Sequence, residues 1–494
     1  MPYRLFLSLA LTSVVGGVPA VEPGDRGYFE PARRLIGIGV GRAELSDDII
    51  ARRAGRMIES QTFAILRDPR AVAGAQRILG PRLQRLFDKA ASASGLPPSL
   101  IAAIAYIESW GDARAQSPTG PRGIMQIAAG TARTMGLKIV YGKRYRTQWR
   151  TRRLRTEQGK WITRRVRERV PYTMLVRDDR LIPEKAIPAA AKYVARLADK
   201  FGGLDWAVFA YHCGEGCAAR MLSLTEQADG MGPPYTVAKM FFGASPAVNR
   251  DLYLAVERQM ERDYSPTYWF RVTRARQLLD MYREDPDGFR KLAAEFRSGA
   301  APERRAPHRL AVWFDSDDPT FRSCDDLEPE ERRDLLGAFD DPDYYGLRLR
   351  TTEATREYCL FASPSAIGTL AYIAFETRRL HEVMDVRGET FVPLEVRSLI
   401  KPLAASEAEP AESGGEKRGE AILHSTGHVF DIDYGDLPPG EREALEFVLN
   451  DLGWEGYLGF IHAADSRTLH IGCSPSSRDF FDEVFADAVE RTKQ

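Results

Sequence analysis

Cysteine is scarce in this 494-residue chain, and so is any excess of charge of one sign. The sequence has five cysteines, and 69 Lys and Arg residues are balanced by 69 Asp and Glu residues. A neutral chain has no overall field that would attract a polyanion, so charged partners must be recognised by local patches, and nucleic acid is not expected as a partner. Because five is an odd number, at least one thiol must lie outside any intramolecular disulfide.

Long apolar runs are also missing, because no segment reaches the ~20 uninterrupted apolar residues that a membrane-spanning helix needs. The run from Leu5 to Val15 follows Arg4 and is followed by small residues that end at Ala20. This pattern predicts a secretory signal peptide over residues 1–20, with an uncleaved membrane anchor as the alternative. We therefore expect an exported protein.

Export places the cysteines in a compartment where disulfides form. The pairs Cys213–Cys217 and Cys324–Cys359 are compatible with the sequence, but spacing alone does not fix the connectivity. The alternative is that these thiols, together with Cys473, are small buried side chains.

The length predicts several domains, because a single hydrophobic core stops growing well below 494 residues. After residue 20 the pattern divides the chain into residues 21–85, 86–225, 226–309 and 310–494. The first three regions are helical by the spacing of their apolar residues, and the third ends in a basic linker from Ser298 to Arg309. The fourth mixes a helix with short alternating strands, so we expect a multidomain protein, mainly α with a C-terminal α+β domain. In that domain we expect a helix over Ser365 to Val383, strands over Thr390 to Val396, Val429 to Tyr434 and Thr468 to Gly472, and a loop over Ala404 to Glu420.

One glutamate lies on the apolar side of a predicted helix. Pro97 and Pro98 predict the start of this helix, which continues over Ser99 to Trp110. Glu108 follows three apolar residues by seven, four and three positions, so it lies on the apolar stripe of the helix. Desolvation raises the pKa of a carboxyl group, so Glu108 is expected to hold a proton near neutral pH and to donate it to a leaving oxygen. The alternative is a buried glutamate paired with an arginine.

Four motifs around this glutamate occur in a fixed order over some 130 residues. They are Glu108-Ser109, "SPTGPRGIMQI" from Ser117, "IPEKAIPAAAKYVARL" from Ile182 and "AYHCGEG" from Ala210. This succession resembles the soluble lytic transglycosylase (SLT) domain, which is a helical, lysozyme-like fold.

The resemblance implies that Glu108 is the sole catalytic carboxyl group and that the substrate is peptidoglycan. By resemblance, Glu108 protonates the glycosidic oxygen between N-acetylmuramic acid and N-acetylglucosamine and then deprotonates the muramyl 6-hydroxyl. The product is a 1,6-anhydro ring, no cofactor is needed, and the protein acts in the periplasm or at the cell wall. Family positions that line the sugar cleft are matched by Ser117, Met125, Gln126, Tyr193 and Tyr211. Ordinary packing is the alternative role of these side chains, above all for Met125 and Tyr193.

The sequence departs from the family motif Ala-Tyr-Asn-Ala-Gly at His212 and Cys213, which affects the expected cleft contacts there. The nearest enzymatic alternative is a hydrolytic muramidase on the same fold, in which Asp112 or Asp178 positions a water molecule. A catalytically silent, wall-binding scaffold is the alternative from another functional class.

A basic segment, residues 138–176, interrupts a connection that is short in the family. It holds thirteen Lys and Arg residues against Glu157 and Glu168. The turn-like sequence that begins at Glu157 lies between two alternating segments and predicts a β-hairpin with Trp149 and Trp161 near its arms. Such a hairpin can bind the anionic peptide stems of the wall or an anionic membrane surface. The alternative is a solvated insertion whose charges prevent edge-to-edge aggregation.

Four of the seven histidines lie near the C-terminus, and they are His424, His428, His462 and His470. On the strand predicted after His424, Asp431 alternates with apolar residues, and Gly427 permits a tight turn that lets His424 and Asp431 converge. His470 points away from its apolar neighbours, so an adjacent strand can bring it to the same place. Two imidazoles and a carboxylate with an open position are typical of catalytic zinc.

The spacing of His424, Asp431 and His470 resembles that of the D-alanyl-D-alanine carboxypeptidase-like zinc peptidases. The resemblance implies a zinc ion on these three residues and an action on the stem peptides of peptidoglycan. Ser398 and Lys401 lie at the family's substrate-binding positions.

The same segment departs from the peptidase family at its general base. Arg467 occupies the position of the usual glutamate, and Asp433 and Asp465 are the substitutes that the sequence offers. The alternative is a sheet domain whose histidines are satisfied by hydrogen bonds and which only binds the wall. The sequence thus predicts a cell-wall enzyme that cuts glycan strands and that cuts, or only holds, the peptide crosslinks.

Overall fold

The computed structural model describes residues 46–298, 318–323, 326, 346–349, 362–384, 389–403, 424–463 and 467–492. Several sequence predictions lie outside these residues: the signal peptide over 1–20, nearly all of the linker after Ser298, the loop over Ala404 to Glu420, the pair Cys324–Cys359, and Asp465. No helix in the described ranges combines the length and the apolar character that a membrane crossing requires.

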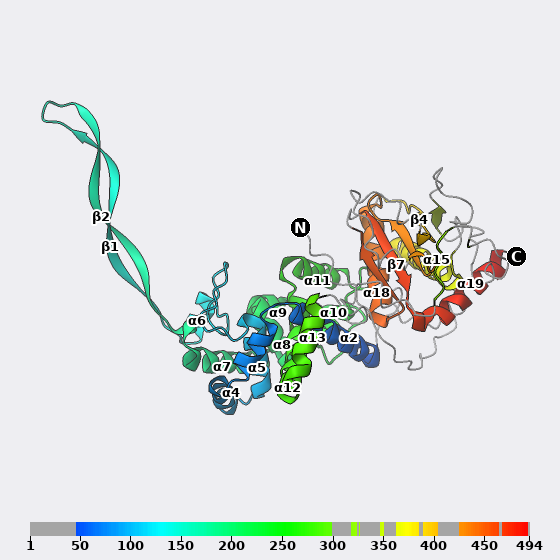
Figure 1. The fold of residues 1–494 in the computed structure, drawn as a ribbon, viewed down its shortest axis with the longest axis horizontal. Helices are drawn as coiled ribbons and strands as arrows, with labels where there is room; N and C mark the ends of the chain where they lie inside the picture. The colour runs from blue at the N-terminus through cyan, green and yellow to red at the C-terminus, as the bar shows by residue number, and fades with distance from the viewer. Residues whose placement is uncertain are drawn as a thin grey trace. The chain divides into compact units, whose positions relative to one another are not determined.

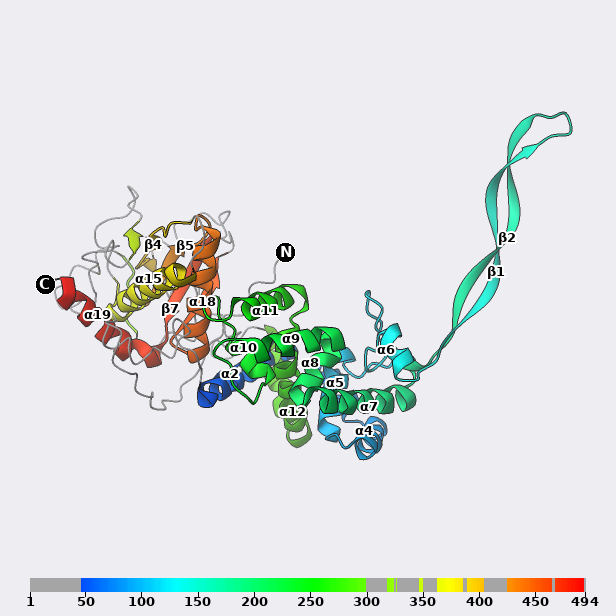
Figure 2. The ribbon, with the colours of Figure 1, turned by 180° about the vertical axis from the view of Figure 1, so that it is seen from behind.

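The chain forms two compact units, which we name the Glu108 unit and the sheet unit. The Glu108 unit comprises Arg70–Ala207 and Ala275–Phe289, and the sheet unit comprises Met1–Pro69, Val208–Arg274 and Arg290–Gln494. The sequence interpretation divided the chain instead into residues 21–85, 86–225, 226–309 and 310–494, and those domain boundaries stay a prediction. Many elements of both units are labelled in Figure 1, and Figure 2 shows them from behind.

The Glu108 unit is helical apart from one hairpin. Its elements are α3 (Ala71–Ile78), α4 (Pro81–Ser94), α5 (Pro98–Ser109), α6 (Ala129–Thr134), β1 (Ile139–Arg155), β2 (Trp161–Asp178), the 3₁₀ helix η2 (Asp179–Leu181), α7 (Pro183–Phe201), the start of α8 (Leu204–Cys213), the end of α12 (Tyr268–Glu284) and the start of α13 (Pro286–Ser298). Helix α5 is the centre of its core, because every residue from Leu100 to Tyr106 is buried. Helix α3 approaches α5 closely at Gly74, where a Cβ atom would lie 2.9 Å from the Cβ atom of Trp110.

The predicted hairpin is confirmed. Strands β1 and β2 pair antiparallel from Ile139 and Asp178 at the base to Arg155 and Trp161 near the tip. The connecting turn includes Gly159, whose φ of +80° lies in the left-handed region that favours glycine. The hairpin leaves its unit between α6 and α7 (Figure 1).

The sheet unit contains helices from the N-terminal half and the whole α+β region. Its helices before the sheet are α2 (Asp47–Leu66), the rest of α8, α9 (Glu215–Gln227), α10 (Val237–Phe242), α11 (Arg250–Asp263), η3 (Ser265–Thr267), and parts of α12 (Tyr268–Glu284) and α13 (Pro286–Ser298). The α+β elements are β3 (Leu347–Leu349), α15 (Pro364–Met384), β4 (Leu394–Ser398), β5 (Val429–Asp433), α18 (Pro439–Glu455), β6 (Leu458–His462), β7 (Thr468–Cys473), η10 (Pro475–Ser477) and α19 (Arg478–Thr492).

The five described strands of this unit form one sheet in the order β3-β4-β5-β7-β6. Strands β3 and β4 are parallel and the other neighbours are antiparallel. The sheet shares one apolar core with α15, α18 and α19. Helix α19 lies close to α15 because Gly368 has no side chain, and a Cβ atom there would lie 2.0 Å from the carbonyl oxygen of Phe481.

The helix predicted over Ser365 to Val383 and the strands predicted from Val429 and Thr468 are confirmed. The strand predicted to start at Thr390 was wrong at its beginning, because β4 starts at Leu394. Pro393 has no N–H group for a strand ladder, and the N–H of Val392 donates to the Glu441 carboxylate at 2.9 Å instead.

Candidate functional site

Glu108 lies in the last turn of α5, and its side chain is half-buried. The helix begins at Pro98, because a proline at the first helical position has its φ already set and has no N–H to leave unbonded. It ends at Ser109, since Trp110 adopts a left-handed conformation with a φ of +54° and donates its N–H to the Tyr106 carbonyl oxygen at 2.8 Å. Glu108 is therefore carried by a helix whose preceding two turns are fixed in the core.

Ser109 connects this helix to the loop that contains the next motif. Its buried hydroxyl oxygen lies 2.8 Å from the Ile124 carbonyl oxygen and 3.1 Å from the Ala105 carbonyl oxygen. The hydroxyl group has one proton, so it donates to one of these two acceptors at a time. This bond holds the loop over residues 115–127 beside the end of α5 that bears Glu108.

The loop is also held by hydrogen bonds of its own. The Gln126 side-chain nitrogen lies 2.8 Å from the Gly123 carbonyl oxygen and 3.2 Å from the Ala115 carbonyl oxygen, and the Gly123 N–H donates to Ala115. The Ser117 hydroxyl lies 2.8 Å from the Thr119 hydroxyl. The amide nitrogen of Gln126 is thus used inside the loop, and Ser117 lies at the loop's own turn.

Arg180, which the sequence interpretation missed, fixes the loop from η2. Its guanidinium group donates to both oxygens of the buried Asp178 carboxylate, at 2.8 and 2.7 Å. It also donates to the carbonyl oxygens of Gly120 and Ile127, at 3.2 and 3.0 Å. At Gly123 a Cβ atom would lie 1.9 Å from the Arg180 carbonyl oxygen, so the two backbones meet without space for a side chain.

The remaining residues expected in the cleft have different environments. Met125 is 1% exposed, so its side chain belongs to the core. Tyr193 is 9% exposed, and the guanidinium of Arg196 lies 5.0 Å from its ring centroid. Both therefore fit the packing alternative that the sequence left open. Tyr211 is on the portion of α8 that belongs to the sheet unit.

The two departures from the Ala-Tyr-Asn-Ala-Gly motif lie on the same portion of α8. The ring of His212 stacks on Tyr268 with 4.3 Å between the centroids. Cys213 and Cys217 carry free thiols, so the disulfide considered from their spacing is not formed.

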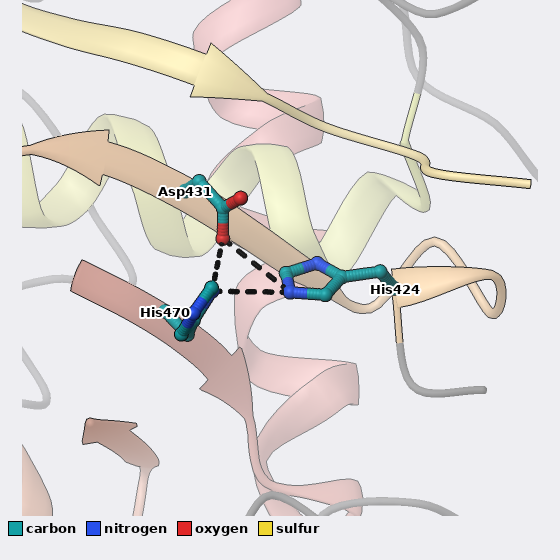
Figure 3. A group of neighbouring side chains, drawn as sticks. All are labelled: His424, Asp431 and His470. Carbon is teal, nitrogen blue, oxygen red and sulfur yellow. Dashed lines mark hydrogen bonds and ion pairs between the residues drawn. The ribbon is translucent and has the colours of Figure 1, made fainter. Parts of the chain in front are cut away.

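In the sheet unit, His424, Asp431 and His470 come together (Figure 3). Asp431 of β5 and His470 of β7 are directly paired across the ladder, and their Oδ1 and Nδ1 atoms lie 2.6 Å apart. The Nε2 atom of His424, which precedes β5, lies 3.1 Å from His470 Nδ1 and 3.4 Å from Asp431 Oδ1. All three residues are buried.

The second oxygen of Asp431 is held by the two residues expected to bind substrate. The Ser398 hydroxyl donates to Oδ2 at 2.7 Å, and the Lys401 ammonium lies 3.4 Å from the same atom. Burial alone would raise the pKa of Asp431, but the charges of His424 and Lys401 and the hydrogen bond from His470 hold that pKa well below its usual range. These contacts therefore favour the carboxylate form of Asp431.

The donor set fits a zinc ion. Tetrahedral zinc with nitrogen ligands at 2.0–2.1 Å separates those ligands by about 3.3 Å. The separations here, 3.1, 3.4 and 2.6 Å, are near this value, and the short one joins atoms that share a hydrogen bond. The three residues can hold a cation through small side-chain movements.

Asp433, which the sequence offered as a general base at this cluster, is engaged elsewhere. Asp433 accepts from the Arg397 guanidinium at 2.9 and 2.5 Å, and its other oxygen accepts the Gly435 N–H at 3.0 Å. Arg467 pairs with Asp436 at 2.5 Å and is half exposed. Asp433 is thus a structural residue.

The other two C-terminal histidines have neighbours outside this cluster. His428 Nδ1 lies 2.8 Å from the Ser363 hydroxyl, and burial together with Arg478 lowers the pKa of His428 to about 4. His462 lies against Tyr434, with 4.9 Å between the ring centroids. The hydrogen-bonded alternative therefore describes His428.

Comparison with known proteins gives a family for the Glu108 region. The model of the transglycosylase SLT domain matches residues 85–150 and 158–230. The chain is 36% identical over 132 residues to the peptidoglycan transglycosylase gp16 of Escherichia phage T7, which is 26% of this chain and 8% of that protein. It is 46% identical over 57 residues to the membrane-bound lytic murein transglycosylase F 2 of Alkalilimnicola ehrlichii, which is 12% of this chain and 13% of that protein.

The alignments span only 8% and 13% of the length of these two relatives. A solved inactive mutant of lytic transglycosylase Slt from Pseudomonas aeruginosa aligns over 42% of this chain and 25% of that chain. Its identity of 18% and TM-score of 0.23 are too low to relate the two folds. What the comparisons show is therefore a match of residues 85–150 and 158–230 to the transglycosylase SLT domain, and Glu108 lies within the matched residues.

Proposed function

We propose that the protein is an exported lytic transglycosylase that cleaves the β-1,4 bond between N-acetylmuramic acid and N-acetylglucosamine in peptidoglycan. The observation that carries the proposal is the place of Glu108, a half-buried carboxyl group on a core helix inside an SLT domain. The names of the relatives describe transglycosylases of peptidoglycan or murein, which supports the same substrate here.

In this proposal one carboxyl group performs both proton transfers. Glu108 donates its proton to the glycosidic oxygen as the bond from that oxygen to the muramyl C1 breaks. The resulting carboxylate takes the proton of the muramyl 6-hydroxyl, whose oxygen forms the new bond to C1. The cleaved glycan strand then ends in a 1,6-anhydro-muramyl residue, and Glu108 has regained its proton. Because the attacking hydroxyl belongs to the substrate, neither water nor a second carboxylate is required.

The environments of the other acidic residues favour this reaction over hydrolysis. A hydrolytic muramidase needs a carboxylate that positions water. Asp178 is buried and both of its oxygens accept from Arg180, and Asp112 lies on an exposed turn where it accepts the Arg114 N–H at 2.8 Å. Both carboxylates considered for that role therefore have structural partners.

The test is digestion of purified sacculi by the parent and by Glu108→Gln, with products identified by mass spectrometry. We expect anhydro-muramyl ends with the parent and a rate lower by ~10²–10⁴-fold with Glu108→Gln. Glu226→Gln, which changes an exposed glutamate of α9, is the matched control and should digest sacculi at the parental rate. Reducing muramyl ends would indicate the muramidase, and undiminished digestion by Glu108→Gln would exclude Glu108 as the acid.

We further propose that the sheet unit binds zinc through His424, Asp431 and His470 and acts on the peptide stems of peptidoglycan. The three ligand atoms within 4.8 Å of one another support this second function. A bound zinc ion acts as a Lewis acid that polarises a peptide carbonyl group. The protein's own side chains orient the ligand. Ser398 and Lys401 contact Oδ2 of Asp431, which keeps Oδ1 turned toward the two histidines.

Zinc titration of the metal-free protein, followed by calorimetry, tests the metal site. We expect the parent to take up one equivalent, His470→Ala to take up far less, and His462→Ala to behave as the parent because His462 lies outside the cluster. New peptide termini from sacculi that disappear with chelator and with His470→Ala would establish the peptidase. Zinc uptake without new termini would make this unit a wall-binding module, and equal uptake by His470→Ala and the parent would exclude the site.

A further inference from the structure

The hairpin of β1 and β2 has two faces of different chemistry. Side chains alternate along a strand, and directly paired residues of an antiparallel ladder share a face. From Tyr141 onward the register therefore assigns each residue to one of two sides. The side that carries Tyr141 is named the aromatic face, and the side that carries Arg144 is named the aliphatic face.

The aromatic face alternates rings with cations. Its rings follow each other on β1 at every fourth residue, which is ~13 Å at about 3.3 Å per residue. The rings are Tyr141, Tyr145, Trp149 and Trp161, and the cations are Lys143, Arg153, Arg155, Arg165, Arg167 and Arg169. The face has no acidic residue, and no ion pair reaches any of its cations within the described part of the chain.

These side chains are open to solvent. Each of the four rings is more than half exposed, from 54% for Tyr145 to 60% for Tyr141. Guanidinium groups lie over the rings: Arg165 and Arg167 at 5.9 and 5.6 Å from the Trp149 centroid, and Arg169 at 4.7 Å from that of Tyr145. A stacked guanidinium is held in place but still presents N–H groups at its edge, so less side-chain entropy is lost when it binds an anion.

The aliphatic face differs from the aromatic face in its number of aromatic rings, in having an acidic residue and in its apolar residues. It has one ring, Tyr172, and its Glu168 pairs with Arg152 at 2.5 Å. Between its arginines it carries aliphatic side chains, which are Leu154, Ile162, Val166, Val170 and Met174. The two faces thus share a positive charge, but only one presents rings and cations without any acid.

We propose that the aromatic face binds a glycan–peptide strand of peptidoglycan and so holds the substrate outside the site at Glu108. This inference rests on the proposed transglycosylase function. Such a strand alternates sugar rings with peptide stems that carry carboxylates, which complements a face of alternating aromatic rings and cations. Charge complementarity and ring stacking can both contribute to binding along the hairpin. Its length is ~55 Å, because β1 has 17 residues at about 3.3 Å each.

The twist of the ribbon favours a strand over a membrane. Figures 1 and 2 show the hairpin twisting along its length, as two-stranded ribbons do. The aromatic face therefore winds around the axis of the hairpin. A planar bilayer meets a winding face along only part of its length, whereas a flexible polymer can follow it.

The experiment measures co-sedimentation of the full chain with purified sacculi, in a Glu108→Gln background that keeps the strands intact. The test variant replaces Arg165, Arg167 and Arg169 of the aromatic face by Gln. The matched control replaces Arg144, Arg150 and Arg164 of the aliphatic face by Gln, which removes the same charge from the same hairpin. We expect about tenfold weaker binding for the test variant, as for three exposed charge contacts, and less than twofold for the control.

Two further arms identify what is bound. Trp149→Ala with Trp161→Ala, at unchanged charge, should weaken binding to sacculi, and sacculi whose carboxylates have been amidated should bind the unaltered hairpin poorly. Equal losses in the two arginine variants would overturn the proposal, since they would indicate charge alone. Tighter binding to vesicles of anionic phospholipid than to sacculi would overturn it in favour of a membrane surface. Cleavage of soluble glycan strands by the parent is measured separately, so failure of the proposed transglycosylase function is recognised independently of the hairpin.

Discussion

At the scale of single residues, Gly123 shows how the loop near Glu108 depends on one missing side chain. Its φ of +80° and the 1.9 Å gap that a Cβ atom would leave to the Arg180 carbonyl oxygen exclude any other residue without a backbone shift. Gly120 of the same loop has a φ of +109° but open space around it. Comparing Gly120 with Gly123 therefore distinguishes the cost of a positive φ from the cost of the close backbone contact.

We predict that Gly123→Ala destabilises the protein more than Gly120→Ala. Both variants place an alanine in a conformation that costs ~1–3 kcal/mol. Only Gly123→Ala must also displace Arg180, so we expect a total loss of about 4 kcal/mol or more for it. Urea unfolding of the two variants measures the difference, and equal losses would contradict the close contact.

Single residues also mark the limit of what the sequence predicts. The half-buried position of Glu108 follows from local spacing, because residues three, four and seven apart share a helix face. The approach of His470 to Asp431 follows from alternation along strands. The role of Arg180 has no such signal, since its acceptors at Gly120 and Ile127 lie 60 and 53 residues away in the chain.

At the scale of elements, α15 carries a buried acid into the core that it shares with α18. Glu376 is 2% exposed, and burial raises its pKa to about 7, although Arg379 opposes this rise. Asp451 of α18 is also buried, and its charge raises the pKa of Glu376 further. The folded state therefore holds a proton on Glu376 that the unfolded chain releases at lower pH.

We predict that Glu376→Gln stabilises the protein at pH 8 and has little effect at pH 5. A carboxyl whose folded pKa is raised loses stability as the pH rises from about 4.5 to about 7, and the loss persists above this window. Removing the ionisable group should restore on the order of 3 kcal/mol at pH 8. Thermal unfolding at both pH values checks this, with the exposed Glu382→Gln of the same helix as control. An equal effect of Glu376→Gln at both pH values would refute it.

Elements with a strong local pattern were predictable, and those defined by distant partners were less so. The hairpin follows from alternation and a turn sequence, and α15 from helical spacing. The start of β4 depends on the Glu441 carboxylate of α18, which accepts the N–H of Val392. No local pattern indicates such a contact.

At the scale of the whole molecule, α2 belongs to the sheet unit although it opens the described chain. Arg53 of α2 is 1% exposed and donates to Asp451 at 2.5 Å and to Glu455 at 2.6 Å, both on α18. These two carboxylates lie 398 and 402 residues further along the chain, so no local sequence pattern indicates their contact with α2. A buried guanidinium with two carboxylates fixes α2 onto α18.

We predict that Arg53→Ala costs ~3–5 kcal/mol, because it leaves buried carboxylates without their cation. Arg52→Ala is the matched control, since the neighbouring side chain is 43% exposed and reaches Glu455 only at 3.5 Å. We expect the control to cost less than ~1 kcal/mol. Urea unfolding of both variants measures the two losses, and a cost for Arg53→Ala as small as that of Arg52→Ala would show that the buried pair is dispensable.

The pairing of α2 with α18 also sets an order for biosynthesis. Arg53 leaves the ribosome 398 residues before Asp451, which is an interval of roughly 20–80 s at ~5–20 residues per second. The Glu108 unit draws most of its chain from a single continuous stretch, Arg70–Ala207, and can acquire its structure during that interval. The buried guanidinium of Arg53 therefore has neither of its two carboxylate partners until α18 has been made.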